Sequence, residues 1–143
     1  MKPIHILLVE DNEGDILITT EALHEGKILN KLTVLRDGKQ AIDYLSEMVE
    51  QANNELPDFI LLDINLPKKN GHEVLQFIKT NRKLKHIVVI MLTTSSAETD
   101  IYRAYNSYAN CYITKPVDAG DFLAAISAIE NFWINIVKLP NRK

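Results

Sequence analysis

Apolar residues along the chain follow two alternating patterns. Short apolar runs occur at residues 4–9, 32–36, 59–62, 87–92 and 111–114. Runs of this length, bounded by turn residues, are typical of strands that are buried on both faces. Between the runs, apolar residues recur every three or four positions, as on one face of a helix. This alternation predicts an α/β fold, a parallel sheet with helices on both faces, but leaves the strand order open.

Polar residues mark where the predicted helices begin. Asn12 is placed to cap the first helix, and Asn70 with Glu73 is typical of a capping box at the start of the third. The pair Asp37-Gly38 is interpreted as a turn before the second helix. The apolar stripe of the first helix is predicted to comprise Ile16, Leu17, Thr20, Leu23 and His24.

Length, charge and cysteine content exclude several classes of protein. At 143 residues, with 46% apolar and 24% charged residues, the chain is expected to form one globular domain over 1–143. The net charge of −3 gives no basic surface for nucleic acid. The N-terminal apolar run is far too short for a signal peptide or a membrane span, so no membrane contact is expected. The single cysteine, Cys111, cannot form an internal disulfide, which suits a cytoplasmic location.

Chemically reactive side chains follow four of the predicted strands at the point where each strand ends. These side chains are Glu10 and Asp11, Asp63, Thr93, and Lys115. Because the carboxyl ends of parallel strands meet at one edge of a sheet, they are expected to converge. Clustered carboxylates repel one another unless a cation lies among them, and Mg²⁺ prefers such oxygen ligands. With an ammonium and a hydroxyl beside it, this edge suits a phosphoryl group that a carboxylate can attack.

Five short segments at the strand ends occur in a specific order. They are Val9-Glu10-Asp11-Asn12, Leu62-Asp63-Ile64-Asn65-Leu66-Pro67, Asn70-Gly71, Thr93-Thr94-Ser95 and Ile113-Thr114-Lys115-Pro116. Together they make the chain resemble the receiver domain of bacterial two-component response regulators. The resemblance covers about residues 4–131, the expected domain core, and leaves 132–143 as a helical extension. It implies a flavodoxin-like (βα)5 fold, a doubly wound parallel sheet with strand order 2-1-3-4-5.

The resemblance also implies a role for each residue at this edge. Asp63 would accept a phosphoryl group from a sensor histidine kinase. Glu10, Asp11 and Asp63 would hold Mg²⁺ together with the main-chain carbonyl of Asn65, and Lys115 would pair with the phosphoryl group.

Two further features follow from the same resemblance. The peptide bond between Lys115 and Pro116 would be cis. Thr93 and Tyr112 match the family's switch pair, in which the hydroxyl moves to a phosphoryl oxygen and the aromatic ring turns inward.

A narrower resemblance indicates which kinase is the partner. Asp11-Asn12-Glu13-Gly14-Asp15, the long loop before the third strand and the ending Asn131-Phe132-Trp133 are similar to single-domain regulators paired with cyanobacterial phytochromes. The implied kinase is a bacterial phytochrome, whereas the downstream protein is not indicated by the sequence.

Two classes of function fit these residues. The first is a phosphorylation switch without an output domain, because the chain ends at Lys143, about a dozen residues past the usual receiver end. The alternative is a Mg-dependent phosphohydrolase or phosphotransferase with Asp63 as nucleophile. Such enzymes usually carry a second acid or base two residues later, where this chain has Asn65. We therefore expect a signalling protein rather than an enzyme, with at most self-phosphorylation from small phosphodonors and self-dephosphorylation.

Each of these residues also has an ordinary structural explanation. On that interpretation Asp63 only caps a turn, Glu10 and Asp11 form a solvated acidic turn, and Tyr112 only packs in the sheet. The histidines are expected to bind no metal, because their scattered positions lack ligand spacing: His5, His24, His72 and His86.

The C-terminal tail carries more apolar residues than one buried helix face needs. A long fifth helix is predicted from Asp118, and its last turns contain Phe132, Trp133, Ile136 and Val137. A helix that is apolar nearly all round is expected to be buried on more than one side. These residues therefore predict a homodimer interface, with the alternative that the tail folds back over its own domain.

Overall fold

The computed structural model describes residues 4–25, 30–51, 55–93 and 111–114, together with Ala124 and Ala128. Lys115 and its bond to Pro116 lie outside these residues, as does the tail in which we expect a dimer interface, residues 132–137. Thr93 and Tyr112 are described only by their positions in their strands.

Five parallel strands form one sheet in the order β2-β1-β3-β4-β5. They are β1 (Ile4–Val9), β2 (Asn30–Leu35), β3 (Phe59–Asp63), β4 (Val88–Thr93) and β5 (Cys111–Thr114). The described helices are α1 (Glu13–Glu25), α2 (Gly38–Glu50) and α3 (Gly71–Thr80). The α/β fold class and the strand order 2-1-3-4-5 implied by the resemblance are confirmed.

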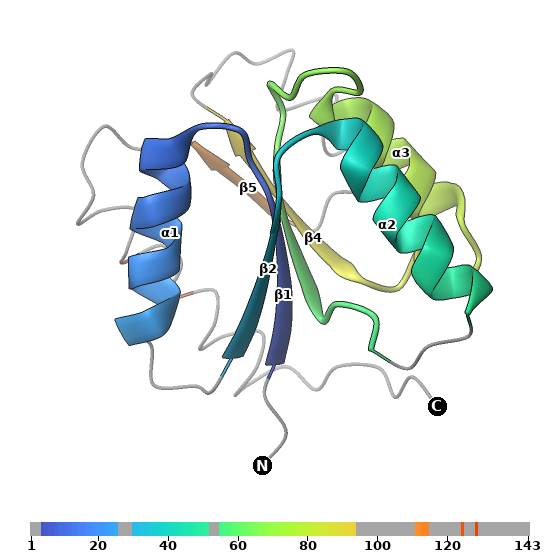
Figure 1. Ribbon diagram of the computed structural model, residues 1–143, viewed down its shortest axis with the longest axis horizontal. Coiled ribbons are helices and arrows are strands. Elements are labelled where there is room, and N and C mark those ends of the chain that lie inside the picture. Colours follow the sequence, from blue (N-terminus) through green and yellow to red (C-terminus); the bar gives the residue numbers. More distant parts are fainter. Residues whose placement is uncertain are drawn as a thin grey trace.

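The central strands β1, β3 and β4 are mostly apolar because helices cover both faces of the sheet. Along β1, Leu7 and Val9 belong to a buried cluster that includes residues of α2 and α3, whereas Ile6 and Leu8 belong to a second cluster with residues of α1. Figure 1 shows α1 on one side of the sheet and α2 and α3 on the other. Alternate residues of one strand thus serve two cores, as expected for a central parallel strand.

The strand register brings the predicted site residues to one edge of the sheet. Val9 pairs with Leu62, so Glu10 and Asp63 follow paired residues on neighbouring strands. Asp63 in turn pairs with Leu92, the residue before Thr93. The carboxyl ends of β1, β3 and β4 therefore lie side by side, as the sequence predicted.

The predicted buried face of α1 is partly wrong. Ile16 and Leu23 are buried as predicted, but Leu17 is 58% exposed, and Thr20 and His24 are also exposed. Apolar residues occur nearly all round this helix, so their period selects no single face, and packing against the sheet decides which are buried. The buried side chains of α1 are Ile16, Thr19, Ala22 and Leu23.

The predicted turn at Asp37-Gly38 is the beginning of α2. Asp37 is the N-cap, whose Oδ1 accepts the Gln40 N–H at 2.8 Å, and Gly38 is the first helical residue. An aspartate that accepts an N–H from a residue just ahead serves a turn or a helix cap equally, so the residue types alone did not distinguish the two. Among the described residues, no helix is long and apolar enough to cross a membrane.

Candidate metal centre

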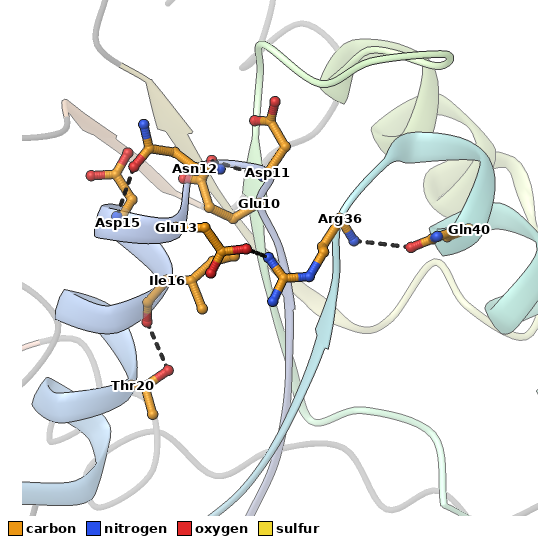
Figure 2. Close-up of polar contacts among 9 residues, drawn as sticks. All are labelled: Glu10, Asp11, Asn12, Glu13, Asp15, Ile16, Thr20, Arg36 and Gln40. Atoms are coloured by element: carbon orange, nitrogen blue, oxygen red, sulfur yellow. Dashed lines mark hydrogen bonds and ion pairs between the residues drawn. The ribbon is translucent and has the colours of Figure 1, made fainter.

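The end of β1 turns sharply into α1 and buries a carboxylate in the turn. Glu10 is 1% exposed, and its Oε2 accepts the main-chain N–H groups of Asp11 at 3.1 Å and Asn12 at 3.3 Å. Asn12 Oδ1 then accepts the Asp15 N–H at 2.9 Å, which confirms Asn12 as a cap of α1 (Figure 2). The turn is thus fixed by its own side chains, and Asp11 at its centre stays exposed.

An ion pair connects the first turn of α1 with the residue that follows β2. The Arg36 guanidinium, just after β2, donates to Glu13 Oε1 in the first turn of α1, and the Arg36 main-chain N–H donates to Gln40 Oε1 in α2 (Figure 2). The contact between Arg36 and Glu13 is exposed to solvent, so it contributes little to stability. It does connect α1, β2 and α2 around the acidic turn.

The end of β3 presents the second buried carboxylate. Asp63 is 4% exposed, and its Oδ1 accepts the Asn65 N–H at 3.3 Å. Ile64 continues the sheet beyond the strand, because its N–H donates to the Leu92 carbonyl at 2.9 Å. The chain then turns away over Pro67 to Asn70, where the predicted capping box with Glu73 begins α3.

Three carboxylates meet between these two strand ends. Glu10, Asp11 and Asp63 each offer an oxygen, and these oxygens lie within 4.8 Å of one another. Two of the three side chains are buried, so their mutual repulsion is poorly screened and favours a bound cation. Hard oxygen donors with an open, exposed side at Asp11 fit a Mg²⁺-like ion that keeps some of its water ligands.

A hollow of about 500 Å³ adjoins Asp11, the exposed member of the three carboxylates. Its lining includes Asp11 and Asn65, and also His72 in the first turn of α3. Sequence reasoning did not connect His72 with the site, although its position two residues after the capping Asn70 places it where α3 starts near a strand end. The full lining is Asp11, Ile64, Asn65, Leu66, Pro67, Asn70 and His72.

The remaining predicted site residues are placed only in part. Thr93 ends β4, paired with Thr114, and Tyr112 of β5 pairs with Met91. These pairs place Thr93 and Tyr112, the positions predicted to act as a switch, on the two strands beyond β3, while Lys115 and Pro116 lie outside the described residues.

Comparison with known proteins shows which kind of protein carries these carboxylates. The profile of the response regulator receiver domain matches residues 6–127, most of the chain. The chain belongs to the response regulator receiver family. Members of this family are signalling proteins of two-component systems that bind a divalent metal and are phosphorylated on an aspartate.

This receiver is similar to regulators from phytochrome systems. The response regulator Rcp1 of Synechocystis sp. is 44% identical over 138 residues, which cover 96% of this chain and 94% of Rcp1. The crystal structure of the phosphorylated cyanobacterial phytochrome response regulator RcpA matches with a TM-score of 0.90 and 43% identity, covering 98% of this receiver and 100% of RcpA. The Mn²⁺-bound form of Rcp1 matches with a TM-score of 0.87 and 44% identity, covering 97% and 100%.

Proposed function

We propose that Asp63 is the phosphoacceptor of this receiver. The observation that supports it is the meeting of Glu10, Asp11 and Asp63 within 4.8 Å at the ends of β1 and β3. Both buried carboxylates accept main-chain N–H groups of the turns that follow them, Glu10 from Asp11 and Asn12 and Asp63 from Asn65, so hydrogen bonding does not distinguish them. Asp63 is proposed because it ends the central strand β3, the position that the resemblance to receiver domains gives to the phosphoacceptor.

The proposed reaction transfers a phosphoryl group from a kinase histidine. A carboxylate oxygen of Asp63 attacks the phosphorus, an O–P bond forms, and the N–P bond of the phosphohistidine breaks. The imidazole leaves with the electron pair of that bond and takes up a proton. Lys115 is proposed to neutralise the phosphoryl oxygens, and Thr93 to donate a hydrogen bond to one of them. Tyr112 is proposed to turn inward when the phosphoryl group is bound, which changes the surface of the domain. The peptide bond before Pro116 is proposed to be cis.

The metal is proposed to be Mg²⁺. Its ligands would be Glu10, Asp11 and Asp63, together with the main-chain carbonyl of Asn65. An oxygen-only donor set supports this choice, and the bound ion would neutralise charge that develops on the phosphoryl group. Glu10 also serves the site without metal, because it orders the turn that presents Asp11.

The partner is proposed to be a sensor histidine kinase of the bacterial phytochrome class. The likeness to Rcp1 and RcpA over almost the whole chain supports this pairing.

The output is proposed to be a changed affinity for a downstream protein in the cytoplasm, or a homodimer formed through residues 132–137. The domain is proposed to span 1–143, with its core at about 4–131. Catalysis by this receiver is proposed to be limited to self-phosphorylation from small phosphodonors and self-dephosphorylation.

Mass spectrometry after treatment with acetyl phosphate and Mg²⁺ tests the phosphoacceptor. We expect one acyl phosphate, on Asp63, and none in Asp63→Asn. Asp58→Asn is the matched control, because Asp58 precedes the same strand at its opposite end, where its Oδ2 accepts the His5 N–H. Undiminished phosphorylation of Asp63→Asn would overturn the assignment.

Phosphotransfer from purified kinases tests the partner. We expect a phytochrome kinase to transfer its phosphoryl group to this receiver faster than kinases of other sensory classes do. Equal rates across the panel would contradict the pairing while leaving Asp63 as the acceptor.

Sedimentation of the full chain and of a truncation after residue 131 tests the dimer, which is expected only in the full chain.

A further inference from the structure

The start of α2 touches the loop between β3 and α3 with no side chain between their backbones. A methyl group added at Gly38 would lie 1.8 Å from the main-chain oxygen of Lys69 and 2.6 Å from its carbonyl carbon. The Gly38 N–H also points to this loop and donates to the Pro67 carbonyl at 3.3 Å. Only glycine permits this approach, because any Cβ would have to displace backbone atoms rather than a flexible side-chain end.

The N-cap of α2 extends the same contact. Asp37 is buried, and one carboxylate oxygen caps its own helix at Gln40. The other, Oδ2, lies 3.6 Å from Lys68 Nζ, across the gap to the loop. Asp37 and Gly38 therefore hold consecutive residues of one loop, which they meet only in the folded chain.

The loop is strained at the point where α2 touches it. Lys68 has φ 68°, in the left-handed region that residues other than glycine seldom adopt. The Lys69 N–H donates to the Pro67 carbonyl at 2.8 Å, which closes a γ-turn around Lys68. A γ-turn with positive φ is the strained form, and such backbone persists only where surrounding contacts hold it. The contacts from Gly38 and Asp37 are of that kind.

The other end of the loop is held against the end of β3, the strand that carries Asp63. The Gly71 N–H donates to the Ile64 carbonyl at 2.8 Å, and a Cβ at Gly71 would lie 2.2 Å from the Asp63 carbonyl oxygen. Asn65 thus sits between two close backbone contacts, one to α3 and one, through residues 67–69, to α2. The peptide that carries the Asn65 carbonyl lies between these two contacts, and its own N–H, that of Leu66, donates to the Ile64 carbonyl at 3.1 Å.

We propose that Asp37 and Gly38 are positioning residues that set the metal affinity of the site through the loop. Their described contacts reach residues 67–69 of the loop. They hold these residues in the strained turn, and that turn keeps the Asn65 carbonyl in the position from which it would bind the ion. This inference rests on the proposed function, because it requires Asn65 as a metal ligand.

Calorimetric Mg²⁺ titration of Gly38→Ala is the main test. We expect the dissociation constant for Mg²⁺ to rise by about 10- to 100-fold, the usual effect of disturbing the groups that orient metal ligands. The initial rate of phosphorylation by acetyl phosphate should fall at low Mg²⁺ and approach the wild-type rate at saturating Mg²⁺. A purely structural role would lower the melting temperature and leave the Mg²⁺ dissociation constant unchanged.

A second variant keeps the test decisive if Gly38→Ala does not fold. Lys68→Gly accepts the positive φ without strain but frees the loop to adopt other conformations. It should fold and bind Mg²⁺ more weakly than the wild type, and Asp37→Asn should show a smaller effect, since asparagine still caps α2 but loses the charge.

A control variant leaves the loop unchanged. Lys39→Ala lies next to Gly38 in α2 and removes only an exposed ion pair, that with Asp43 at 2.8 Å. It should bind Mg²⁺ within about twofold of the wild type, as exposed changes usually do.

The outcomes separate this inference from the proposed function. In the first outcome the wild type binds Mg²⁺, and each of Gly38→Ala and Lys68→Gly that folds binds it as tightly as the wild type does. The positioning role is then wrong, and the proposed metal site is unaffected. If the wild type binds no Mg²⁺, the proposed metal site itself is wrong, and the inference falls with it. Weakened binding in Lys39→Ala to the same degree would also overturn it.

Discussion

Val9 and Leu62 pair on adjacent parallel strands, so the residues that follow them, Glu10 and Asp63, lie at the same level of the sheet edge. Both side chains are buried there, and both are acids. Asp11 completes the cluster from the exposed side. The register of two strands therefore concentrates negative charge at one point of the sheet edge, which is unfavourable until a cation binds.

Replacing Asp11 with alanine should stabilise the metal-free protein and abolish its response to Mg²⁺. We expect the melting temperature without metal to rise by about 2 °C, because a fraction of a kcal/mol of repulsion is removed in a domain of this size. Added Mg²⁺ should raise the melting temperature of the wild type but not of Asp11→Ala, since only a bound ligand stabilises the fold. Asp43→Ala, an exposed acid on α2, is the control and should keep the wild-type Mg²⁺ response. Equal Mg²⁺ stabilisation of Asp11→Ala would contradict the metal assignment.

Leu17 and Leu23 on α1 should respond very differently to truncation. Leu23 is buried against the sheet, so Leu23→Ala should cost about 2–5 kcal/mol in the free energy of unfolding. Leu17 is mostly exposed, and Leu17→Ala should stay within about 0.5 kcal/mol of the wild type. Urea unfolding of both variants measures the difference. Similar losses for the two would mean that α1 is rotated relative to the structure described.

Lys79 should stabilise the end of α3 through its ammonium group. Its Nζ donates to the carbonyls of Lys85 at 3.1 Å and Ile87 at 2.8 Å, where the chain turns toward β4. Lys79→Met keeps the apolar stem and removes these donors, so we expect a loss of about 1–2 kcal/mol in the free energy of unfolding. The exposed Lys83→Met is the control, expected within about 0.5 kcal/mol of the wild type. Equal stability of the two variants would show that the contacts contribute nothing.

The sheet was predictable because its signals are local and repeated. Each strand is a short apolar run, and the site residues follow the runs directly, as Asp63 follows Leu62. Parallel pairing then brings the strand ends together without further information from the side chains. The strand order came from the family resemblance, because periodicity is the same for any order of strands.

The misassigned features depend on contacts between distant residues. α1 is apolar nearly all round, so the choice of Leu23 over Leu17 for the core is made by the sheet and not by the helix. The contact of Gly38 with Lys69 has no local signal either, because the pair Asp37-Gly38 is equally typical of a turn. His72 lines the hollow beside Asp11 because the start of α3 lies near the end of β3, and no local pattern in the sequence indicates this.

His5 lies in a buried polar network at the opposite end of β1 from the acidic cluster. Its Nδ1 is 3.0 Å from the Glu55 carbonyl oxygen, which requires a proton on Nδ1, and its Nε2 is 2.9 Å from Thr33 Oγ1. The neutral imidazole satisfies both contacts, with Nε2 accepting from the hydroxyl. Burial is the main cause that lowers the pKa of His5 from its ordinary value of 6.5, and the contact with Glu55 opposes the shift only in part.

The stability of the fold should therefore fall as the pH drops below about 6.5, where the unfolded chain begins to protonate His5 and the folded chain does not. The loss continues until the pH reaches the lowered pKa of the folded state, below which both states carry the proton. Urea unfolding at pH 7.5 and pH 5.5 measures it as a drop in midpoint. That drop should be smaller in His5→Gln than in the wild type, and unchanged in His86→Gln, which alters an exposed histidine. If His5→Gln shows the full wild-type drop, other groups cause the acid sensitivity, and protonation of His5 does not lower the free energy of unfolding.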